Sequence, residues 1–560
     1  MKILFFFLSI FFLTKFYSQV LLDDVNKDKV QYLASNSAYR NWWDVQHYTL
    51  DIQPDITNQT LKGKVSIDFK INSNWNKISD NYMQIDLQAP LLIDSMFLKG
   101  RKINHFTKPT NSVYLISFSK FLPQLIGERN DTDTLLSLVI YYSGKPITAK
   151  NPPWDGGMIW TKDSMKRDWI AVACQGIGGS VWFPCKDIEY DEPDRGVDVF
   201  IHTIKKMKAV SNGRLVEVIA NELKDVYHWR VTYPINIYDI TMDIGYYVSF
   251  EEKLKLKNDE DLDCQYFVLD YEFEKAVKQF NQVKKILTSF EEWFGNYPFY
   301  NDGYKVVQTP FLGMEHQSAI AYGNDFKNGY KGTDLSKTGW GLKFDFILVH
   351  ETGHEWFGNA ISSFDIADMW IHEAFTTYSE ALYLESYYGK KAAQAYVKGI
   401  QCRIKNDIPI IGVYNHRQEG SGDMYFKGAN MIQMYRELLD DDAQFKKMLV
   451  GMGQFWYKNS TSKEIESYMN EFRNPILKAD FTKMFDQYLR TKQVPILEFK
   501  KLKGKTLVKW SNCVVGFDMP VKLKNGNFIQ PTTEWLTIKK GLLNLRIDPN
   551  FYIELKEVKI

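Results

Sequence analysis

The stretch FILVHETGHEWFGNAISSFDIADMWIHEAFTTYSE, residues 346–380, contains metal-ligating side chains at the spacing of a helix. His350 and His354 are four residues apart, so on an α-helix they project from one face, one turn apart. Glu351 follows His350 directly and completes an H-E-x-x-H motif. Because both imidazoles can reach one ion from that face, the stretch predicts a metal-binding helix.

Two helices are expected around this motif. An apolar stripe that includes Leu342, Phe346, Ile347 and Val349, followed by a Gly358-Asn359 stop, predicts a first helix over 342–357. A second helix is expected over 370–384, because apolar residues recur there at helical spacing. This second helix carries Glu373.

The two histidines leave a catalytic zinc site one ligand short, since such sites use three protein ligands and keep one position open. Glu373 lies after eighteen intervening residues, 355–372. That distance is sufficient for the first helix to end and for an antiparallel helix to return over the ion. His350, His354 and Glu373 are therefore predicted to bind one Zn²⁺ per chain.

Three further segments accompany the motif. Residues 312–320 read LGMEHQSAI, residues 425–430 read YFKGAN, and residues 174–187 read CQGIGGSVWFPCKD, with SNG following at 211–213. Together with HETGH and Glu373, these segments resemble the zinc aminopeptidase family of the gluzincin type, which includes aminopeptidase N and leukotriene hydrolase. They occur in the family's order and extend through about two-thirds of the chain.

The resemblance implies an α+β multidomain fold. An N-terminal antiparallel β-saddle domain is expected over 19–250, a thermolysin-like, mainly helical zinc catalytic domain over 251–494, and a small C-terminal β-sandwich over 495–560. Alternating apolar residues in the first and last of these ranges favour strands, and helical apolar spacing begins at Tyr271. Many relatives continue into a large helical C-terminal domain, for which this sequence has no residues, so it resembles a short form of the family.

The first residues predict the compartment. Residues 1–18 contain a lysine, a short apolar run and a small residue at the end, which is typical of a secretory signal peptide. We therefore expect an exported protein, periplasmic or extracellular; an uncleaved anchor is the alternative. No later stretch has eighteen consecutive apolar residues, so stable membrane insertion is not expected.

Composition narrows the choice of partners. The chain has 69 basic and 68 acidic residues, which gives no reason to expect binding to nucleic acid. A monomer is expected. The five cysteines are too sparse for a disulfide scaffold, and Cys174 and Cys185 either pair or remain buried thiols.

Two residues are expected to carry the chemistry. Glu351 lies on the same helical turn as the histidines without being needed as a ligand, so it is predicted to act as the general base that passes a proton from water to the leaving amine. The resemblance assigns Tyr425 to the oxyanion that develops on the scissile carbonyl. The alternative for Tyr425 is ordinary packing in the core.

Four residues are expected to bind the substrate. A peptide would add to the strand expected over 313–321, where Gly313 and Met314 leave the backbone accessible. The Glu315 carboxylate would pair with the α-amine, and the resemblance makes Gln175 a second acceptor. The predicted function is a secreted zinc metallo-aminopeptidase that acts on peptides with a free N-terminus.

The sequence departs from the family pattern at three positions. Leu312 replaces a glycine, and His316 and His372 each replace an asparagine. The two histidines either orient the ligands or are substitutions without a role in the mechanism. Two alternative functions stay open: a secreted binding protein with an inactive metallopeptidase-like fold, and an epoxide hydrolase side activity that uses the same zinc.

Overall fold

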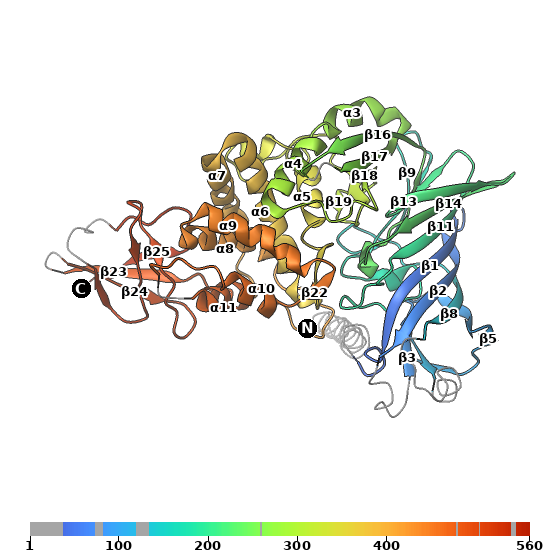
Figure 1. The fold of residues 1–560 in the computed structure, drawn as a ribbon, viewed down its shortest axis with the longest axis horizontal. Helices are drawn as coiled ribbons and strands as arrows, with labels where there is room; N and C mark the ends of the chain where they lie inside the picture. Colours follow the sequence, from blue (N-terminus) through green and yellow to red (C-terminus); the bar gives the residue numbers. More distant parts are fainter. Residues whose placement is uncertain are drawn as a thin grey trace, which may run out of the picture.

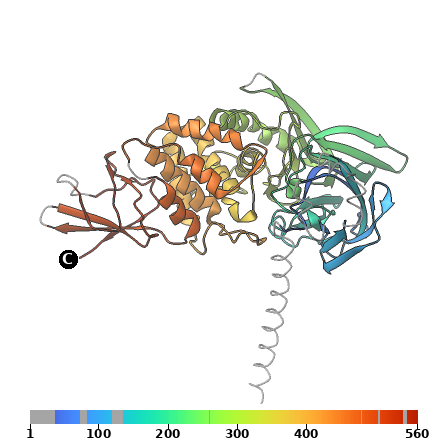
Figure 2. The ribbon, with the colours of Figure 1, turned by 60° about the horizontal axis from the view of Figure 1, so that its bottom comes forward.

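Three parts follow one another along the long axis of the molecule (Figure 1). The computed structural model describes residues 37–72, 82–118, 134–257, 260–477, 480–502, 505–538 and 545–559. A β-rich N-terminal part, a helical middle part and a β-rich C-terminal part succeed each other in this order, and the second view shows the same succession (Figure 2). The expected signal peptide, 1–18, lies outside the described residues.

The described strands of the N-terminal part form sheets with the orders β13-β14-β11-β1-β2-β8-β4-β5, β12-β15-β10-β9 and β3-β7-β6. Their pairs are antiparallel except for β1 and β11, which are parallel, with Tyr48 beside Val197. The alternation of Tyr48, Leu50 and Ile52 places all three side chains in the core, as the sequence pattern predicts. The strands are β1 (Trp43–Asp55), β2 (Thr60–Ile71), β3 (Tyr82–Asp86), β4 (Leu92–Leu98), β5 (Arg101–Lys102), β6 (Phe106–Thr110), β7 (Val113–Ser117), β8 (Leu136–Gly144), β9 (Gly157–Lys162), β10 (Asp168–Ala173), β11 (Val197–Ile204), β12 (Lys208–Val210), β13 (Arg214–Ala220), β14 (Lys224–Val231) and β15 (Asp243–Gly245).

The middle part begins with a five-stranded sheet of order β16-β17-β18-β20-β19. The expected domain boundary at 250 falls inside β16 (Tyr247–Lys255), which pairs along its length with β17 (Asp261–Leu269). Next come β18 (Tyr304–Gln308), β19 (Gly313–Met314) and β20 (Ile320–Tyr322).

The prediction of a single strand over 313–321 is wrong, because residues 315–319 lie outside the pairing of β19 with β20. The Ser318 amide donates to Glu355 at 2.8 Å, and the Ser318 hydroxyl accepts from the Gly213 amide at 2.8 Å. These long-range contacts draw the backbone into a turn at this point. Glu315 therefore lies at the end of β19 and not within a longer strand.

The helix that carries the histidines is shorter than expected. It is α5 (Phe346–His354), not 342–357. The helix starts at Phe346 because the Asp345 side chain caps it by accepting from the amides of Ile347 and Leu348. Leu342 lies in a separate 3-10 turn and is 44% exposed. The helix that carries Glu373 is α6 (Trp370–Tyr388), four residues longer than expected.

The helical pattern that begins at Tyr271 gives two helices, α3 (Phe273–Phe280) and α4 (Val283–Phe294). At the break, the Gln282 side chain accepts from the Asp345 amide at 3.0 Å. The apolar face still continues across the break, since Phe280 and Val283 are both buried. The remaining helices are α7 (Lys390–Ile400), α8 (Asp423–Leu439), α9 (Asp442–Gly451), α10 (Ser462–Met469) and α11 (Thr482–Arg490).

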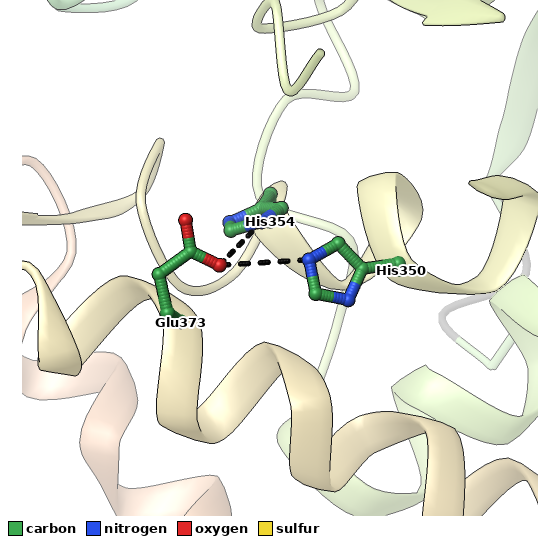
Figure 3. Close-up of side chains that lie close together, drawn as sticks. All are labelled: His350, His354 and Glu373. Atoms are coloured by element: carbon green, nitrogen blue, oxygen red, sulfur yellow. Dashed lines mark ion pairs between the residues drawn. The ribbon is translucent and has the colours of Figure 1, made fainter. Parts of the chain in front are cut away.

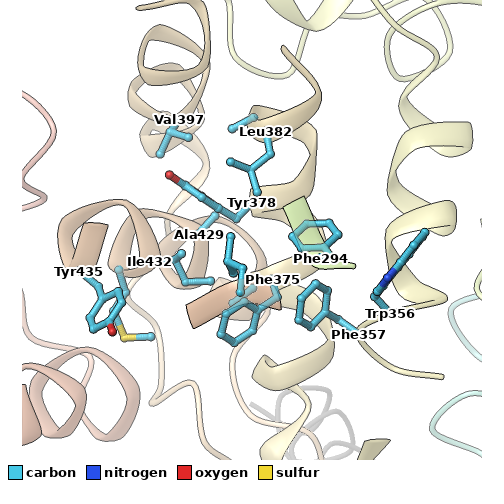
Figure 4. Packing of buried hydrophobic residues seen from close by; sticks show 14 of the residues in the cluster. Phe294, Trp356, Phe357, Phe375, Tyr378, Leu382, Val397, Ala429, Ile432 and Tyr435 are labelled. Atoms are coloured by element: carbon cyan, nitrogen blue, oxygen red, sulfur yellow. The ribbon is translucent and has the colours of Figure 1, made fainter. Parts of the chain in front are cut away.

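Aromatic residues fix the two metal-site helices relative to one another. Phe357, just beyond α5, stacks on Phe375 of α6 with ring centroids 4.9 Å apart and meets Phe294 of α4 edge to face at 5.0 Å (Figure 4). All three are buried. Since close-packed interiors deform little, this packing sets where His350 and Glu373 meet.

The C-terminal part returns to strands directly after the expected boundary at Val494-Pro495. One sheet has the order β27-β24-β23-β28, and β25 pairs with β26. The strands are β23 (Ile496–Leu502), β24 (Lys505–Ser511), β25 (Val521–Lys522), β26 (Phe528–Ile529), β27 (Leu536–Ile538) and β28 (Glu554–Glu557).

The structure describes the state of the cysteines and the length of the helices. All five cysteines are free, and Cys174 and Cys185 are buried thiols, which decides the alternative left open above. Within the described ranges, every helix is too short or too polar to cross a membrane.

Candidate functional site

Three side chains of the predicted metal site converge in the structure. The Glu373 Oε2 atom lies 3.5 Å from His350 Nε2 and 3.4 Å from His354 Nε2 (Figure 3). The three ligand atoms all lie within 4.8 Å of one another, and all three residues are buried. Helical spacing puts both imidazoles on one face of α5, and α6 brings Glu373 over that face.

The polar atoms of this trio fit a cation. Glu373 Oε2 is buried and has no hydrogen-bond partner among the described residues. An unpartnered carboxylate oxygen is costly in a protein interior unless a cation or donor meets it there. Burial would raise the pKa of Glu373, but the imidazoles of His354 and His350 outweigh burial and hold this pKa well below its usual range. The carboxylate is therefore an anionic ligand beside two imidazole nitrogens.

The Nδ1 nitrogen of each histidine contacts an acceptor on the side away from Glu373. His350 Nδ1 lies 2.7 Å from Glu380 Oε1, and the other oxygen of Glu380 accepts from the Tyr396 hydroxyl at 2.5 Å. His354 Nδ1 lies 2.9 Å from the Phe357 carbonyl. These contacts orient each ring with Nε2 toward Glu373.

Glu380 lines the site and contacts a predicted metal ligand, and the sequence analysis missed it. It lies seven residues after Glu373, two turns along α6, so both carboxylates face α5. This spacing of seven residues was the one signal in the sequence that could have identified Glu380.

Glu351 lies beside the trio without belonging to it. Its carboxylate, Glu315 and His354 also form a group whose ligand atoms lie within 4.8 Å of one another. Burial raises the pKa of Glu351 to about 7, although the imidazoles of His350 and His354 lower it. A carboxyl with a pKa near neutrality is suited to accept and release a proton.

Gly313 gives this carboxylate its room. A Cβ at Gly313 would lie 2.6 Å from Glu351 Oε1 and 2.9 Å from the Ile347 side chain, which is closer than real Cβ contacts allow. The strand β19 therefore passes directly over the face of α5 that carries Glu351. Met314, the next residue of this strand, is buried, and it lines a cavity that Gly313 and Glu351 also line.

Glu315 is the predicted anchor for an amino terminus, and it contacts two residues of the N-terminal part. Its Oε1 atom accepts from Gln175 Nε2 at 2.5 Å and from the Tyr238 hydroxyl at 3.2 Å. Burial raises the pKa of Glu315. Tyr238 was not predicted, because no local pattern connects it to a residue 77 positions away.

Tyr425 lies in the site and not in the general core. Its hydroxyl donates to Glu373 Oε1 at 2.8 Å, and its ring lies 6.0 Å from that of His350. Burial raises its pKa well above the usual value, so the hydroxyl stays a neutral donor. In this arrangement the hydroxyl bonds a predicted metal ligand, and it lines the same cavity as Glu351.

These residues line one cavity of about 410 Å³, which is within the usual range for small-ligand sites. The cavity brings together every predicted site residue: His350, His354, Glu373, Glu351, Tyr425, Gln175, Gly313, Met314 and Glu315.

The two histidines at departures from the family pattern lie outside the trio. His372 Nε2 accepts from the Ser363 amide at 2.8 Å, so this ring orients the backbone after α5. His316 is fully buried, and neither ring nitrogen has a hydrogen-bond partner in the part of the chain that the structure describes. Burial lowers the pKa of each to about 3, so both rings are neutral.

The chain thus combines a β-rich part with a helical part, and the helical part carries a buried trio of two histidines and one carboxylate. Residues 44–238 match the Peptidase M1 N-terminal domain, and residues 278–488 match the Peptidase family M1 domain. The chain belongs to peptidase family M1.

Individual relatives are distant. The chain is 20% identical over 478 residues to endoplasmic reticulum aminopeptidase 1 of Rattus norvegicus, which covers 79% of this chain and 48% of that protein. It is 21% identical over 490 residues to aminopeptidase N of Lactobacillus helveticus, which covers 81% and 51%. The chain thus spans about half the length of these curated relatives.

A solved structure shows the same fold over nearly its whole length. An M1 zinc metallopeptidase from Deinococcus radiodurans, a mutant bound to a Tyr-Ser-Ala substrate, superposes with a TM-score of 0.62 at 17% identity. The match covers 80% of this chain and 95% of that one. The likeness confirms the expected succession of a β-rich N-terminal domain and a helical catalytic domain.

Proposed function

We propose that the protein is an exported zinc aminopeptidase that removes residues from the free N-terminus of peptides. The observation that carries this proposal is the buried Glu315 carboxylate, which shares a cavity with the metal-ligand trio. Family membership and the names of the relatives, which are aminopeptidases and a zinc metallopeptidase, support it.

Zinc is the cation that fits the trio best. Two imidazoles and one carboxylate are the donor set of many catalytic zinc sites, which keep a position open for water. When bound by His350, His354 and Glu373, zinc supplies Lewis-acid chemistry that lowers the pKa of water and polarises a carbonyl.

Two side chains move or hold protons in the proposed reaction. The Glu351 carboxylate takes a proton from the attacking water and gives it to the leaving amine. The Tyr425 hydroxyl leaves its bond to Glu373 Oε1 and donates to the carbonyl oxygen as negative charge develops there.

The restriction to N-terminal residues follows from Glu315. A protonated α-amine gives this buried carboxylate an ionic partner, whereas an acetylated amine leaves the charge desolvated. Gln175 and Tyr238 occupy one oxygen of the carboxylate from the N-terminal part. The peptide backbone then lies along β19, at Gly313 and Met314, with its amino end at Glu315.

The proposal includes export, a monomer and a C-terminal β-sandwich. The pattern of residues 1–18 supports export, and the presence of the strands β23 to β28 supports a sandwich. Mass spectrometry of the N-terminus of protein recovered from outside the cytoplasm tests the first point. A mature protein that begins near residue 19 is expected, and a protein retained inside the cell with residues 1–18 intact contradicts it.

Leucine anilide and its N-acetyl form test the restriction to free amino termini. The wild-type enzyme should hydrolyse the free form at least 100-fold faster in kcat/KM. Glu315→Gln should lower kcat/KM for the free form by about 10- to 100-fold, because a charge-assisted bond is lost. Glu274→Gln, at an exposed position of α3, is the matched control. Comparable hydrolysis of both forms by the wild type would make the protein an endopeptidase.

A further inference from the structure

The lining of the cavity contains one cationic side chain and several carboxylates. Among the described residues that line it, Arg403 is the only lysine or arginine, against the carboxylates of Glu315, Glu351, Glu373 and Glu380. The mechanism proposed above gives Arg403 no role.

The backbone at Arg403 is fixed against the start of α8. Asp423 accepts from the amides of Lys405 and Asn406 at 2.8 and 2.6 Å. Gln401 donates to the Asn430 side chain at 2.7 Å. Since α8 also carries Tyr425, these contacts hold the Arg403 segment at the same cavity wall as the catalytic tyrosine.

The guanidinium itself is exposed and available. Its one hydrogen bond to a described residue is long, from Nε to the Leu335 carbonyl at 3.4 Å. No carboxylate of the described chain pairs with it. A planar guanidinium with free Nη groups is suited to bind a carboxylate through two parallel hydrogen bonds.

Contacts along α5 show that the cavity has two chemically different ends. Glu315 lies near Glu351 and His354, toward the C-terminal end of the helix. At the other end, Phe346 stacks on His350 with ring centroids 5.3 Å apart and meets Tyr330 at 5.5 Å. A helix rises about 1.5 Å per residue, so Phe346 and His354 are roughly 12 Å apart along the axis.

Arg403 belongs to the aromatic end. Its hydrogen-bond partner, Leu335, lies two residues beyond Thr333, which pairs with Tyr330 through two backbone hydrogen bonds of 2.9 Å. Leu335 and Tyr330 both line the cavity. A peptide with its amino end at Glu315 that runs along α5 therefore directs its carboxyl end toward Arg403. An extended chain spans about 3.3 to 3.6 Å per residue, so roughly 12 Å corresponds to three or four residues.

We infer that Arg403 binds the C-terminal carboxylate of short substrates, so that the enzyme prefers tri- and tetrapeptides with both ends free. This inference rests on the proposed function and adds the class of substrate. A zwitterionic peptide matches the charge order of the cavity, with its ammonium at Glu315 and its carboxylate at Arg403. The pairing acts on binding at a point remote from the scissile bond, so its loss should appear mainly in KM.

Three substrates test the inference: Leu-Ala-Ala with a free carboxylate, the same peptide as its C-terminal amide, and leucine anilide. The wild type should prefer the free acid by at least about tenfold in kcat/KM. Arg403→Gln should lower kcat/KM for the acid by about tenfold, mainly through KM, and change the amide and the anilide by less than about threefold. Arg403→Lys should retain part of the preference, because an ammonium keeps the charge without the bidentate geometry.

The control is Arg473→Gln, since Arg473 is exposed and also donates to a backbone carbonyl, that of Asn470, away from the cavity. Equal wild-type turnover of acid and amide, with the anilide hydrolysed, overturns the role of Arg403 and leaves the aminopeptidase proposal intact. An equal loss on all three substrates in Arg403→Gln also overturns it, because that result indicates a structural role. A wild type that hydrolyses none of them overturns the proposed function and this inference with it.

Discussion

Replacing Glu380 by glutamine should weaken zinc binding while the fold stays intact. Glu380 touches no predicted ligand atom directly, but its two oxygens bond His350 Nδ1 at 2.7 Å and the Tyr396 hydroxyl at 2.5 Å. Glutamine keeps the volume and can still accept one of these bonds, but it removes the charge that makes the imidazole a better donor to the metal.

The size of the effect follows from those two bonds. Loss of an outer partner of a ligating histidine typically costs 10- to 100-fold in metal affinity, which is about 1.4 to 2.7 kcal/mol. Because glutamine retains part of the contact, we expect Glu380→Gln near the lower value. Glu380→Ala leaves both the imidazole N–H and the tyrosine hydroxyl without their partner, so it should reach the upper value and also lower Tm.

Competition for zinc with a chromophoric chelator measures the affinity, and circular dichroism reports Tm for each variant. Glu385→Gln is the matched control, since Glu385 lies five residues further along α6 and pairs with Arg436 at 2.7 Å instead. A zinc affinity of Glu380→Gln within about threefold of wild type would refute the reasoning. An equal loss of affinity in the Glu385 control would also refute it, because the effect would then come from general destabilisation of α6.

Three further outcomes are expected. Glu351→Gln should keep about one zinc per chain by elemental analysis and abolish hydrolysis of leucine anilide, so retained hydrolysis would remove Glu351 from the role of base. Tyr425→Phe should lower kcat by about 10²- to 10³-fold with little change in KM, and a kcat within threefold of wild type would return Tyr425 to packing. Burial depresses the pKa of His316 to about 3, so the unfolded chain binds one proton more than the folded chain between that value and about 6.5. Unfolding free energy should therefore fall by about 1.4 kcal/mol per pH unit below pH 6.5 through this residue; denaturant titrations should show a shallower fall in His316→Asn, and an unchanged slope would contradict the prediction.

The convergence of the two histidines could be predicted from the sequence because helical geometry alone relates them. His350 and His354 share a face at any position in a helix, and that relation does not depend on the rest of the fold. Glu380 obeys the same geometry relative to Glu373, so it was predictable as well, but an outer-shell carboxylate has no motif that marks it.

The details that failed depend on contacts between distant segments. Asp345 precedes an apolar run and is a typical N-cap, but Leu342 extended the apolar pattern and shifted the expected helix start by four residues. The turn after Glu315 depends on the Ser318 contact with Glu355, and the break before α4 on the Gln282 contact with Asp345. Local pattern contains no information on such pairs.

The proposed recognition of an amino terminus depends in the same way on an interface between two parts of the chain. Gln175, which bonds Glu315, lies in a loop whose next carbonyl, that of Gly176, accepts from Arg417 Nε at 3.0 Å. The same guanidinium pairs with Asp187 at 2.9 Å, and all of its partners here belong to the N-terminal part. A side chain of the helical part thus holds the loop that completes the Glu315 pocket. Because the trio lies wholly within the helical part, we expect the proposed metal binding to survive a loosened interface, and the proposed discrimination of free from blocked amino termini to be lost.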